Sequence, residues 1–234
     1  MSSRLRWASV AVGAALASLG ALRMSSAATA TLIEQDSSEV VDGWNITTAP
    51  GVALVAISSN NEIYIEKAAN FTVPDQGLQI SFDPVAGVGS PATLIDFTDE
   101  MVQNNTGQAF SGFDFLLLNI GSANATFPGV SNVFAPPKGT GYDYTSVNLN
   151  GTGDVLSYTG NQDAGTTSSW GSAAVGDNLL IDAPAGSDFT FKEQSESGGG
   201  GTAVPVPAAA WQSLASLAVL GLIRVGRRAK RRLT

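Results

Sequence analysis

The chain has 234 residues and a formal net charge of −8, and it contains neither cysteine nor histidine. This composition excludes disulfide bonds, nucleophiles of the Ser-His-Asp and Cys-His types, and zinc sites built from histidine and cysteine. All 20 acidic residues lie between Glu34 and Glu196, together with three lysines, so that segment has a formal charge of −17. Such a surface repels nucleic acid and anionic polymers and favours cations, basic partners or neutral glycans.

The N-terminus has the three parts of a secretory signal peptide. Two arginines precede an apolar run from Trp7 to Leu22, and small residues follow it. Ala28-Thr29-Ala30 fits a cleavage site of the Ala-x-Ala type, and Ser26-Ala27-Ala28 is a second candidate. The apolar run is short for a membrane span, which needs about 20 residues. We therefore expect residues 1–30 to form a signal helix that is cleaved on export.

Residues 31–194 read as short strands separated by turns. Five segments are rich in β-branched and aromatic residues or alternate with a period of two, which places one face against a core. They are Ile63–Ile65, Gln79–Phe82, Thr93–Phe97, Phe113–Leu118 and Phe189–Lys192. The alternation predicts that Phe113, Phe115, Phe189 and Phe191 are buried.

Turn sequences separate these segments, among them Asn60-Asn61 and Pro74-Asp75-Gln76-Gly77. No stretch keeps a helical period for three turns, and Asp99–Gln103 could form only a single helical turn. Many short strands with frequent turns predict an all-β fold, an antiparallel β-sandwich ectodomain of about one domain's length. A closed barrel is the next choice.

The C-terminal part of the sequence contains a Gly/Ser-rich segment that is followed by an apolar stretch with a basic end. A Gly/Ser-rich linker is expected at residues 195–203. The apolar stretch at 208–223 predicts one short transmembrane helix, since 16 residues span roughly 24 Å. Six basic residues in the last 11 predict a cytoplasmic end at 224–232 by the positive-inside rule, namely Arg224, Arg227, Arg228, Lys230, Arg231 and Arg232.

The tail at 204–234 resembles a PEP-CTERM sorting domain, which is carried by presumed exosortase substrates of many Gram-negative bacteria. The Pro-Glu-Pro signature of that family is Pro205-Val206-Pro207 in this chain. The resemblance implies that an exosortase-like membrane enzyme recognises or cleaves the segment formed by Val204, Pro205, Val206 and Pro207. It also implies an inner-membrane-anchored intermediate, later release to the cell surface or the outside, and association with exopolysaccharide and biofilm.

Two groups of acidic residues are candidates for binding Ca²⁺, which takes six to eight oxygen ligands. Neither group has the spacing of an EF-hand loop, and a solvated surface is the alternative for both. We expect no cofactor and no catalytic residue, with calcium as the one candidate ion. The two groups are Asp36, Glu39 and Asp42, and Asp96, Asp99 and Glu100.

Several aromatic residues could form a platform for stacking on sugars, although a place in the core or at a sheet edge explains them equally well. These residues are Trp44, Tyr142, Tyr144, Tyr158 and Trp170. The sequence predicts an exported, non-enzymatic cell-surface or extracellular-matrix protein that is processed through its tail. A glycan-binding β-sandwich module, assisted by calcium, is the alternative. An enzyme is a distant third choice.

Overall fold

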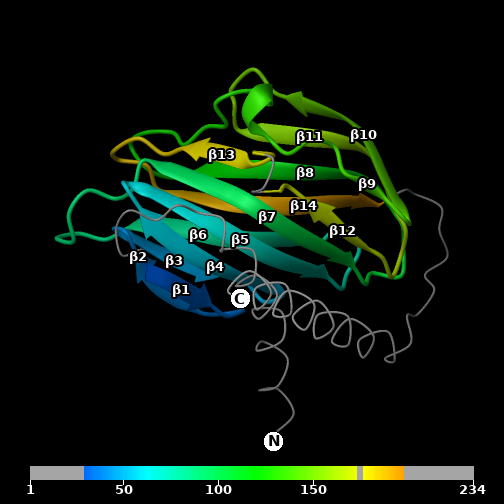
Figure 1. Cartoon of the computed structure of the whole chain (residues 1–234), viewed down its shortest axis with the longest axis horizontal. Coiled ribbons are helices and arrows are strands. Elements are labelled where there is room, and N and C mark those ends of the chain that lie inside the picture. The colour runs from blue at the N-terminus through cyan, green and yellow to red at the C-terminus, as the bar shows by residue number, and fades with distance from the viewer. Residues whose placement is uncertain (1–28, 173–175, 198–234) are drawn as a thin grey trace, which may run out of the picture.

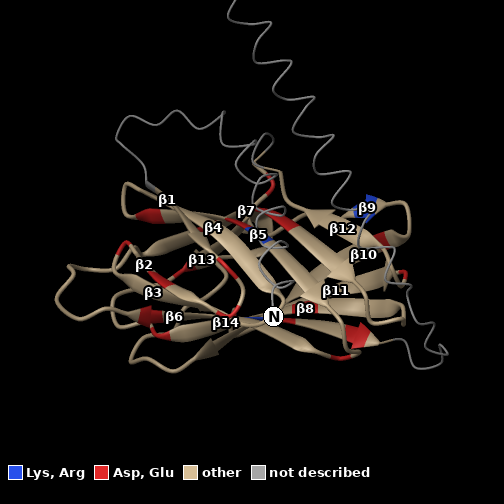
Figure 2. Ribbon diagram, turned by 90° about the horizontal axis from the view of Figure 1, so that it is seen from below, with Lys and Arg blue, Asp and Glu red and all other residues tan. Residues whose placement is uncertain are grey.

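The structure is a computed structural model that describes residues 29–172 and 176–197. These residues form two stacked β-sheets (Figures 1 and 2). The strands of the first sheet are β1 (Thr29–Ile33), β4 (Val52–Ser59), β5 (Glu62–Phe71), β7 (Leu94–Asn104), β12 (Thr167–Trp170) and β13 (Leu179–Asp182). Their order is β1-β4-β5-β7-β12, and β13 also pairs with β7.

The second sheet has eight strands in the order β2-β3-β6-β14-β8-β11-β10-β9. Their bounds are β2 (Ser38–Val41), β3 (Trp44–Thr48), β6 (Gly77–Pro84), β8 (Phe110–Asn119), β9 (Lys138–Gly139), β10 (Tyr142–Leu149), β11 (Val155–Gln162) and β14 (Phe189–Ser197). A single turn of 3-10 helix, η2, lies at Val130–Asn132. In the edge view of Figure 2, β1, β4, β5 and β7 lie in one layer, and β6, β14 and β8 lie in the other.

The predicted all-β class and the predicted strands are confirmed. The five segments lie in β5, β6, β7, β8 and β14, except that Thr93 precedes the start of β7 at Leu94. Phe113 and Phe115 are fully buried, whereas Leu118 on the same strand is 42% exposed. Phe189 and Phe191 are fully buried as well. The period of two therefore identifies which face of β8 and β14 contacts the core.

Two tight hairpins depend on residues that accept a positive φ. Asn60 and Asn61 have φ values of 55° and 63° and connect β4 to β5. Asp42 and Gly43 have φ values of 46° and 81° and connect β2 to β3. Two-residue turns with positive φ match the right-handed twist of the paired strands. At Gly43 a Cβ atom would lie 2.7 Å from Cα of Pro91, so space as well as φ requires glycine there.

The structure differs from the sequence-based expectation at three places. β5 and β7 pair in parallel, because the chain crosses to the other sheet as β6 before it returns as β7; the other strand pairs are antiparallel. The helical turn considered for Asp99–Gln103 is wrong, since those residues lie within β7. β14 continues to Ser197, so it includes the first three residues of the segment expected as a linker, and Ser195 is buried.

The interface between the sheets is packed with aromatic rings. Phe82 and Phe189 stack with their ring centres 4.9 Å apart, and Phe115 and Phe191 stack at 5.6 Å. The indole of Trp170 contacts the rings of Phe113, Phe115, Phe134, Tyr144 and Tyr158. Burial of large apolar surfaces stabilises a chain that has no disulfide bond.

Among the described residues, no helix is long and apolar enough to cross a membrane. Of the signal helix expected at 1–30, residues 1–28 lie outside the described residues and Thr29 and Ala30 belong to β1; the transmembrane helix expected at 208–223 lies outside the described residues. Those two expectations remain predictions.

Replacing Phe115 by alanine should lower the free energy of unfolding by about 3–5 kcal/mol, because the side chain is fully buried and leaves a cavity between the sheets. Chemical denaturation of the two proteins measures the difference. Leu118→Ala, on the exposed face of the same strand, is the control and should change stability by less than about 0.5 kcal/mol. Equal effects at the two positions would contradict the assigned facing of β8.

Candidate functional site: a lysine enclosed by two glutamates

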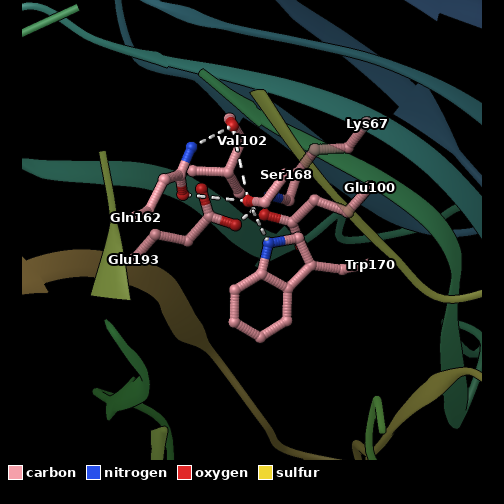
Figure 3. Close-up of polar contacts among 7 residues, drawn as sticks. All are labelled: Lys67, Glu100, Val102, Gln162, Ser168, Trp170 and Glu193. Carbon is pink, nitrogen blue, oxygen red and sulfur yellow. Dashed lines mark hydrogen bonds and ion pairs between the residues drawn. The ribbon is translucent and has the colours of Figure 1, made fainter. Parts of the chain in front are cut away.

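A lysine and two glutamates meet in the interior between the two sheets (Figure 3). Lys67 is on β5, Glu100 on β7 and Glu193 on β14, so both sheets contribute. Nζ of Lys67 lies 2.5 Å from Oε1 of Glu100 and donates a hydrogen bond to Oε1 of Glu193. The side chains of Lys67 and Glu100 are fully buried, and that of Glu193 is 2% exposed. We call these three residues the buried charge cluster.

Glu100 faces the interior because β7 contains a β-bulge. The pairing of β5 with β7 shifts by one residue after Ile65, which leaves Thr98 without a partner on β5. Oγ1 of Thr98 donates a hydrogen bond of 3.3 Å to the carbonyl of Ile65. Before the bulge Phe97 faces the core, and after it the even-numbered Glu100 does. The bulge therefore makes Glu100 the direct register partner of Lys67.

Aromatic rings enclose the buried charge cluster. The ring centre of Phe191 lies 5.7 Å from Nζ of Lys67, close enough for a cation-π contact when the amine is charged. Phe97 stacks on the ring of Phe191 at 4.6 Å. On the other side of β7, Trp170 is the register partner of Glu100. The charged groups therefore lie in apolar surroundings, where electrostatic interactions are stronger than in water.

Burial changes the protonation of the cluster. It lowers the pKa of Lys67 to about 8, although the negative charge of Glu100 acts in the opposite direction. Burial raises the pKa of the Glu100 carboxyl, which Lys67 partly offsets. The pKa values of Tyr144 and Tyr158 are also raised, mainly by burial and further by the charge of Glu100. All four shifts favour the uncharged form of the group.

The charges of the cluster do not balance. One amine and two carboxyls carry a net charge of −1 when all three are ionised. Within the part of the chain that the structure describes, Oε2 of Glu100 and Oε2 of Glu193 accept no hydrogen bond. A buried carboxylate without partners is costly, by several kcal/mol. One additional proton would make the three groups neutral as a set, and the raised pKa of the Glu100 carboxyl acts in that direction.

A second polar group lies beside the cluster and is fully hydrogen-bonded (Figure 3). Nε1 of Trp170 donates to Oγ of Ser168 at 2.8 Å, and Oγ of Ser168 donates to Oε1 of Gln162 at 2.9 Å. Nε2 of Gln162 donates to the carbonyl of Val102 at 2.9 Å. These contacts fix the indole and connect β11 and β12 to β7. In contrast, Oε2 of Glu100 and Oε2 of Glu193 accept no hydrogen bond from the described residues.

The aromatic residues proposed for stacking on sugars lie mostly in the core. Trp44, Tyr144, Tyr158 and Trp170 are buried, and Tyr142 is partly buried. Trp44 donates its Nε1 proton to the carbonyl of Ala92 at 2.9 Å, and Tyr158 donates to the carbonyl of Phe134 at 2.8 Å. The core interpretation of these residues is therefore confirmed for the four that are buried, and they form no exposed platform.

The acidic residues considered for calcium do not come together as a metal site within the described residues. Both carboxylate oxygens of Asp96 accept hydrogen bonds of 2.9 Å from Nδ2 of Asn178, while Glu100 points inward to Lys67. In residues 29–172 and 176–197, no three histidine, cysteine, aspartate or glutamate side chains are grouped as a metal site. The other candidates are Asp36 and Asp42 in turns, Glu39 on the exposed face of β2, and Asp99 on β7.

Sequence reasoning missed two members of the buried charge cluster. Lys67 follows Ile63 and Ile65 at a period of two, and Glu193 follows Phe191 in the same way. If the alternation of each strand is extended by two residues, it predicts that the side chains of Lys67 and Glu193 face the core. The predicted processing segment at 204–207 and the basic residues at 224–232 lie outside the described residues.

The Asp96 carboxyl has a raised pKa of about 6, caused by burial and opposed by its hydrogen bonds from Asn178. A carboxyl whose pKa is higher in the folded state stabilises the fold below its unfolded pKa, and that stability is lost as the pH rises through about 6. Asp96→Asn removes the buried charge and keeps an acceptor for Asn178. The variant should be more stable than wild type at pH 8 by about 1–2 kcal/mol, allowing for partial solvent access.

Urea denaturation of both proteins at pH 4 and at pH 8 measures this gain, which should vanish at the lower pH. Asp182→Asn, at an exposed position on the neighbouring strand β13, is the control and should have little effect at either pH. A loss of stability in Asp96→Asn at pH 8 would show that the aspartate is needed as an anion.

Three comparisons with known proteins, by family models, by curated sequences and by solved structures, found no match to this chain.

Proposed function

We propose that this chain is an exported, non-enzymatic cell-surface or extracellular-matrix protein that is processed through a C-terminal sorting tail. The observation that carries the proposal is the extent of the folded domain. Within the described residues, the sandwich runs from β1 at Thr29 to β14 at Ser197, between the candidate cleavage site that ends at Ala28 and the glycine-rich segment. The sandwich thus fills the segment between two sequences that have the composition of targeting elements.

The position of β1 favours one of the two signal-peptide cleavage sites. Cleavage after Ala28 leaves the strand whole, whereas cleavage after Ala30 removes two residues that pair with β4. Thr29 and Ala30 pair with Ser58 and Ile57. Because an edge strand gains its stability from this ladder, we expect the mature chain to begin at Thr29.

The burial of Lys67, Glu100 and Glu193 between the two sheets supports a structural role for the domain. The buried charge cluster has no more than 2% of any side chain exposed, so a substrate in solution cannot contact it without opening the sandwich. The chain has no histidine or cysteine that could act elsewhere. Both points favour a non-enzymatic protein.

The charge of the domain limits its partners. Figure 2 shows acidic residues on strands and loops of both sheets and very few basic ones. Lys138, one of three lysines in the domain, already pairs with Asp143 at 3.1 Å. A domain of this charge repels polyanions, which favours a neutral or cationic polysaccharide as its partner in a matrix. A glycan-binding module would have to use aromatic residues other than the four that the core contains.

Replacing both Pro205 and Pro207 by alanine should leave export intact and block removal of the tail, because the sorting proposal assigns recognition to this extended segment. The variant should accumulate as a membrane-bound, full-length protein, while wild type loses about 30 residues, the length of the proposed tail. Immunoblots of membrane and extracellular fractions measure the difference.

The matched control replaces Pro128 and Pro184, two exposed prolines of the domain, and should be processed like wild type. Wild-type protein that is recovered outside the cell and still contains Trp211 and Arg232 by mass spectrometry would contradict the sorting proposal. The protein would then be a simple tail-anchored one.

N-terminal sequencing of the envelope form should give Thr29 as the first residue, for the reason drawn from β1. Recovery of Met1 or Ser2 would refute cleavage of the signal. A start at Thr31 would keep export but contradict the argument from the strand.

A further inference from the structure

The buried charge cluster joins a nucleophile and two carboxyls in a place that solvent does not reach. Nζ of Lys67 contacts Oε1 of Glu193 and lies 2.5 Å from Oε1 of Glu100. We propose that this cluster is a self-modification site, where Nζ of Lys67 and the side-chain carboxyl of Glu193 condense to an amide that covalently joins the two sheets. Glu100 is the group that moves protons during this reaction.

The amine has the properties of an activated nucleophile. A lysine becomes nucleophilic when an apolar environment favours its neutral form. Burial lowers the pKa of Lys67 to about 8, and the ring of Phe191, on which Phe97 stacks, lies 5.7 Å from Nζ. With one additional proton, which the net negative charge of the cluster favours, one carboxyl is protonated, and the ammonium can pass its own proton to the other carboxyl. The amine is then neutral and both acids are protonated.

The reaction needs no further reactant. The lone pair of Nζ adds to Cδ of Glu193 while the Glu100 acid donates its proton to the carbonyl oxygen of Glu193 and takes one proton from the nitrogen on its other oxygen. Glu100 then passes that proton to one hydroxyl of the tetrahedral intermediate, the bond from Cδ to that oxygen breaks, and water leaves. The remaining hydroxyl returns its proton to Glu100 as the amide carbonyl forms. The amine and the acid have become one amide and one water, nothing is oxidised or reduced, and Glu100 ends in its starting form. General acid–base assistance of this kind accelerates reactions by about 10²–10⁴-fold.

The geometry favours Glu193 over Glu100 as the acyl partner. Both glutamates form an ion pair with Nζ of Lys67; Glu193 also accepts its hydrogen bond and faces it from the other sheet, whereas Glu100 lies on the strand next to Lys67 in the same sheet. The raised pKa of Glu100 also makes it an effective proton donor. Reacting groups that a fold holds in contact behave as if at very high concentration, with effective molarities of about 10⁵ M or more. Exclusion of bulk water disfavours the reverse hydrolysis.

Formation of the amide removes two buried charges from the cluster. A neutral amide replaces one buried cation and one buried anion, and the oxygen lost as water comes from a residue whose Oε2 accepts no hydrogen bond among the described residues. The new N–H can donate to Glu100, which keeps one partner. Condensation thus converts an imperfectly satisfied charge cluster into a hydrogen-bonded neutral one.

The bond would close a covalent loop from β5 to the last strand. Lys67 and Glu193 are separated by 126 positions in sequence, and β14 lies between β6 and β8 at the centre of the eight-stranded sheet. If the proposed function holds, force on the tail or the matrix enters the domain through the end of β14 at Ser197. A cross-link at Glu193, four residues before that end, keeps β14 in the sandwich under such force.

The intact mass of the purified, folded full-length or processed protein tests the proposal directly. We expect a mass lower than that of the sequence by one water. Trypsin should fail to cleave after Lys67 and should yield a branched peptide that carries the segment beginning at Glu193. The map is simple, because Lys67, Lys138 and Lys192 are the only basic residues between Arg23 and Arg224. Tandem mass spectrometry locates the branch.

Three variants separate the roles of the residues. Glu100→Gln keeps the contact between Lys67 and Glu193 and should abolish most of the water loss, since the proton relay is gone. Lys67→Met and Glu193→Met should abolish it entirely. Lys138→Met, at an exposed lysine that pairs with Asp143, is the matched control and should keep the water loss. Near-ultraviolet circular dichroism of each sample verifies that its aromatic core is folded.

The wild-type measurement requires no variant to fold. Wild-type protein with the full sequence mass and efficient tryptic cleavage after Lys67, in a sample with a folded aromatic core, would overturn the proposal. A branch from Lys67 to Glu100 would overturn the assignment of Glu193. Neither result bears on export or tail processing, so failure here is distinct from failure of the proposed function.

Discussion

The fold has to accommodate the charge of Lys67 between two sheets of aromatic and aliphatic side chains. A buried ammonium is tolerated only with anionic or hydrogen-bonding partners close by, and two glutamates supply them. This requirement places constraints on three central strands at once. β5 has to present Lys67, β7 has to bulge at Thr98 to present Glu100, and β14 has to lie opposite them.

Around that point the sandwich is stabilised by ring packing. Trp170, on β12 of the first sheet, contacts rings on β8 and β11 of the second sheet, and its indole nitrogen donates to Ser168, which Gln162 holds in turn. Because the chain has no cysteine, no disulfide bond joins the sheets. Ring packing holds them together, with any bond that forms within the buried charge cluster. An acidic exterior adds solubility and self-repulsion, which the core has to offset.

Much of the fold could be predicted from the sequence because short segments of β8 and β14 alternate with a period of two around their phenylalanines. That period predicts the burial of Phe113, Phe115, Phe189 and Phe191. The pair Asn60-Asn61 predicts a tight hairpin. The parallel pairing of β5 with β7 could not be predicted, because it depends on which sheet β6 joins. That choice is made by packing between segments far apart in the chain.

The candidate site was predicted less well than the fold, because a β-bulge at Thr98 changes which side chains of β7 face the core. The bulge at Thr98 shifts the alternation of β7 by one, so Glu100 faces the core although a regular strand would turn it outward. In the sequence Glu100 therefore looks like one more surface carboxylate beside Asp96 and Asp99. Lys67 and Glu193 do follow the regular alternation, but a charged residue at an inward position is unexpected without its partner.

The chemical state of the Lys67 nitrogen tests the central claim most directly. In protein labelled with ¹⁵N at its lysine side chains, the described domain contributes three signals, from Lys67, Lys138 and Lys192. Lys138 and Lys192 contact Asp143 and Gln194 near the surface and should give ammonium signals. The account predicts that Lys67 gives a secondary-amide signal with one attached proton, protected from exchange with solvent. A third ammonium signal, assigned to Lys67 in the folded protein, would contradict it.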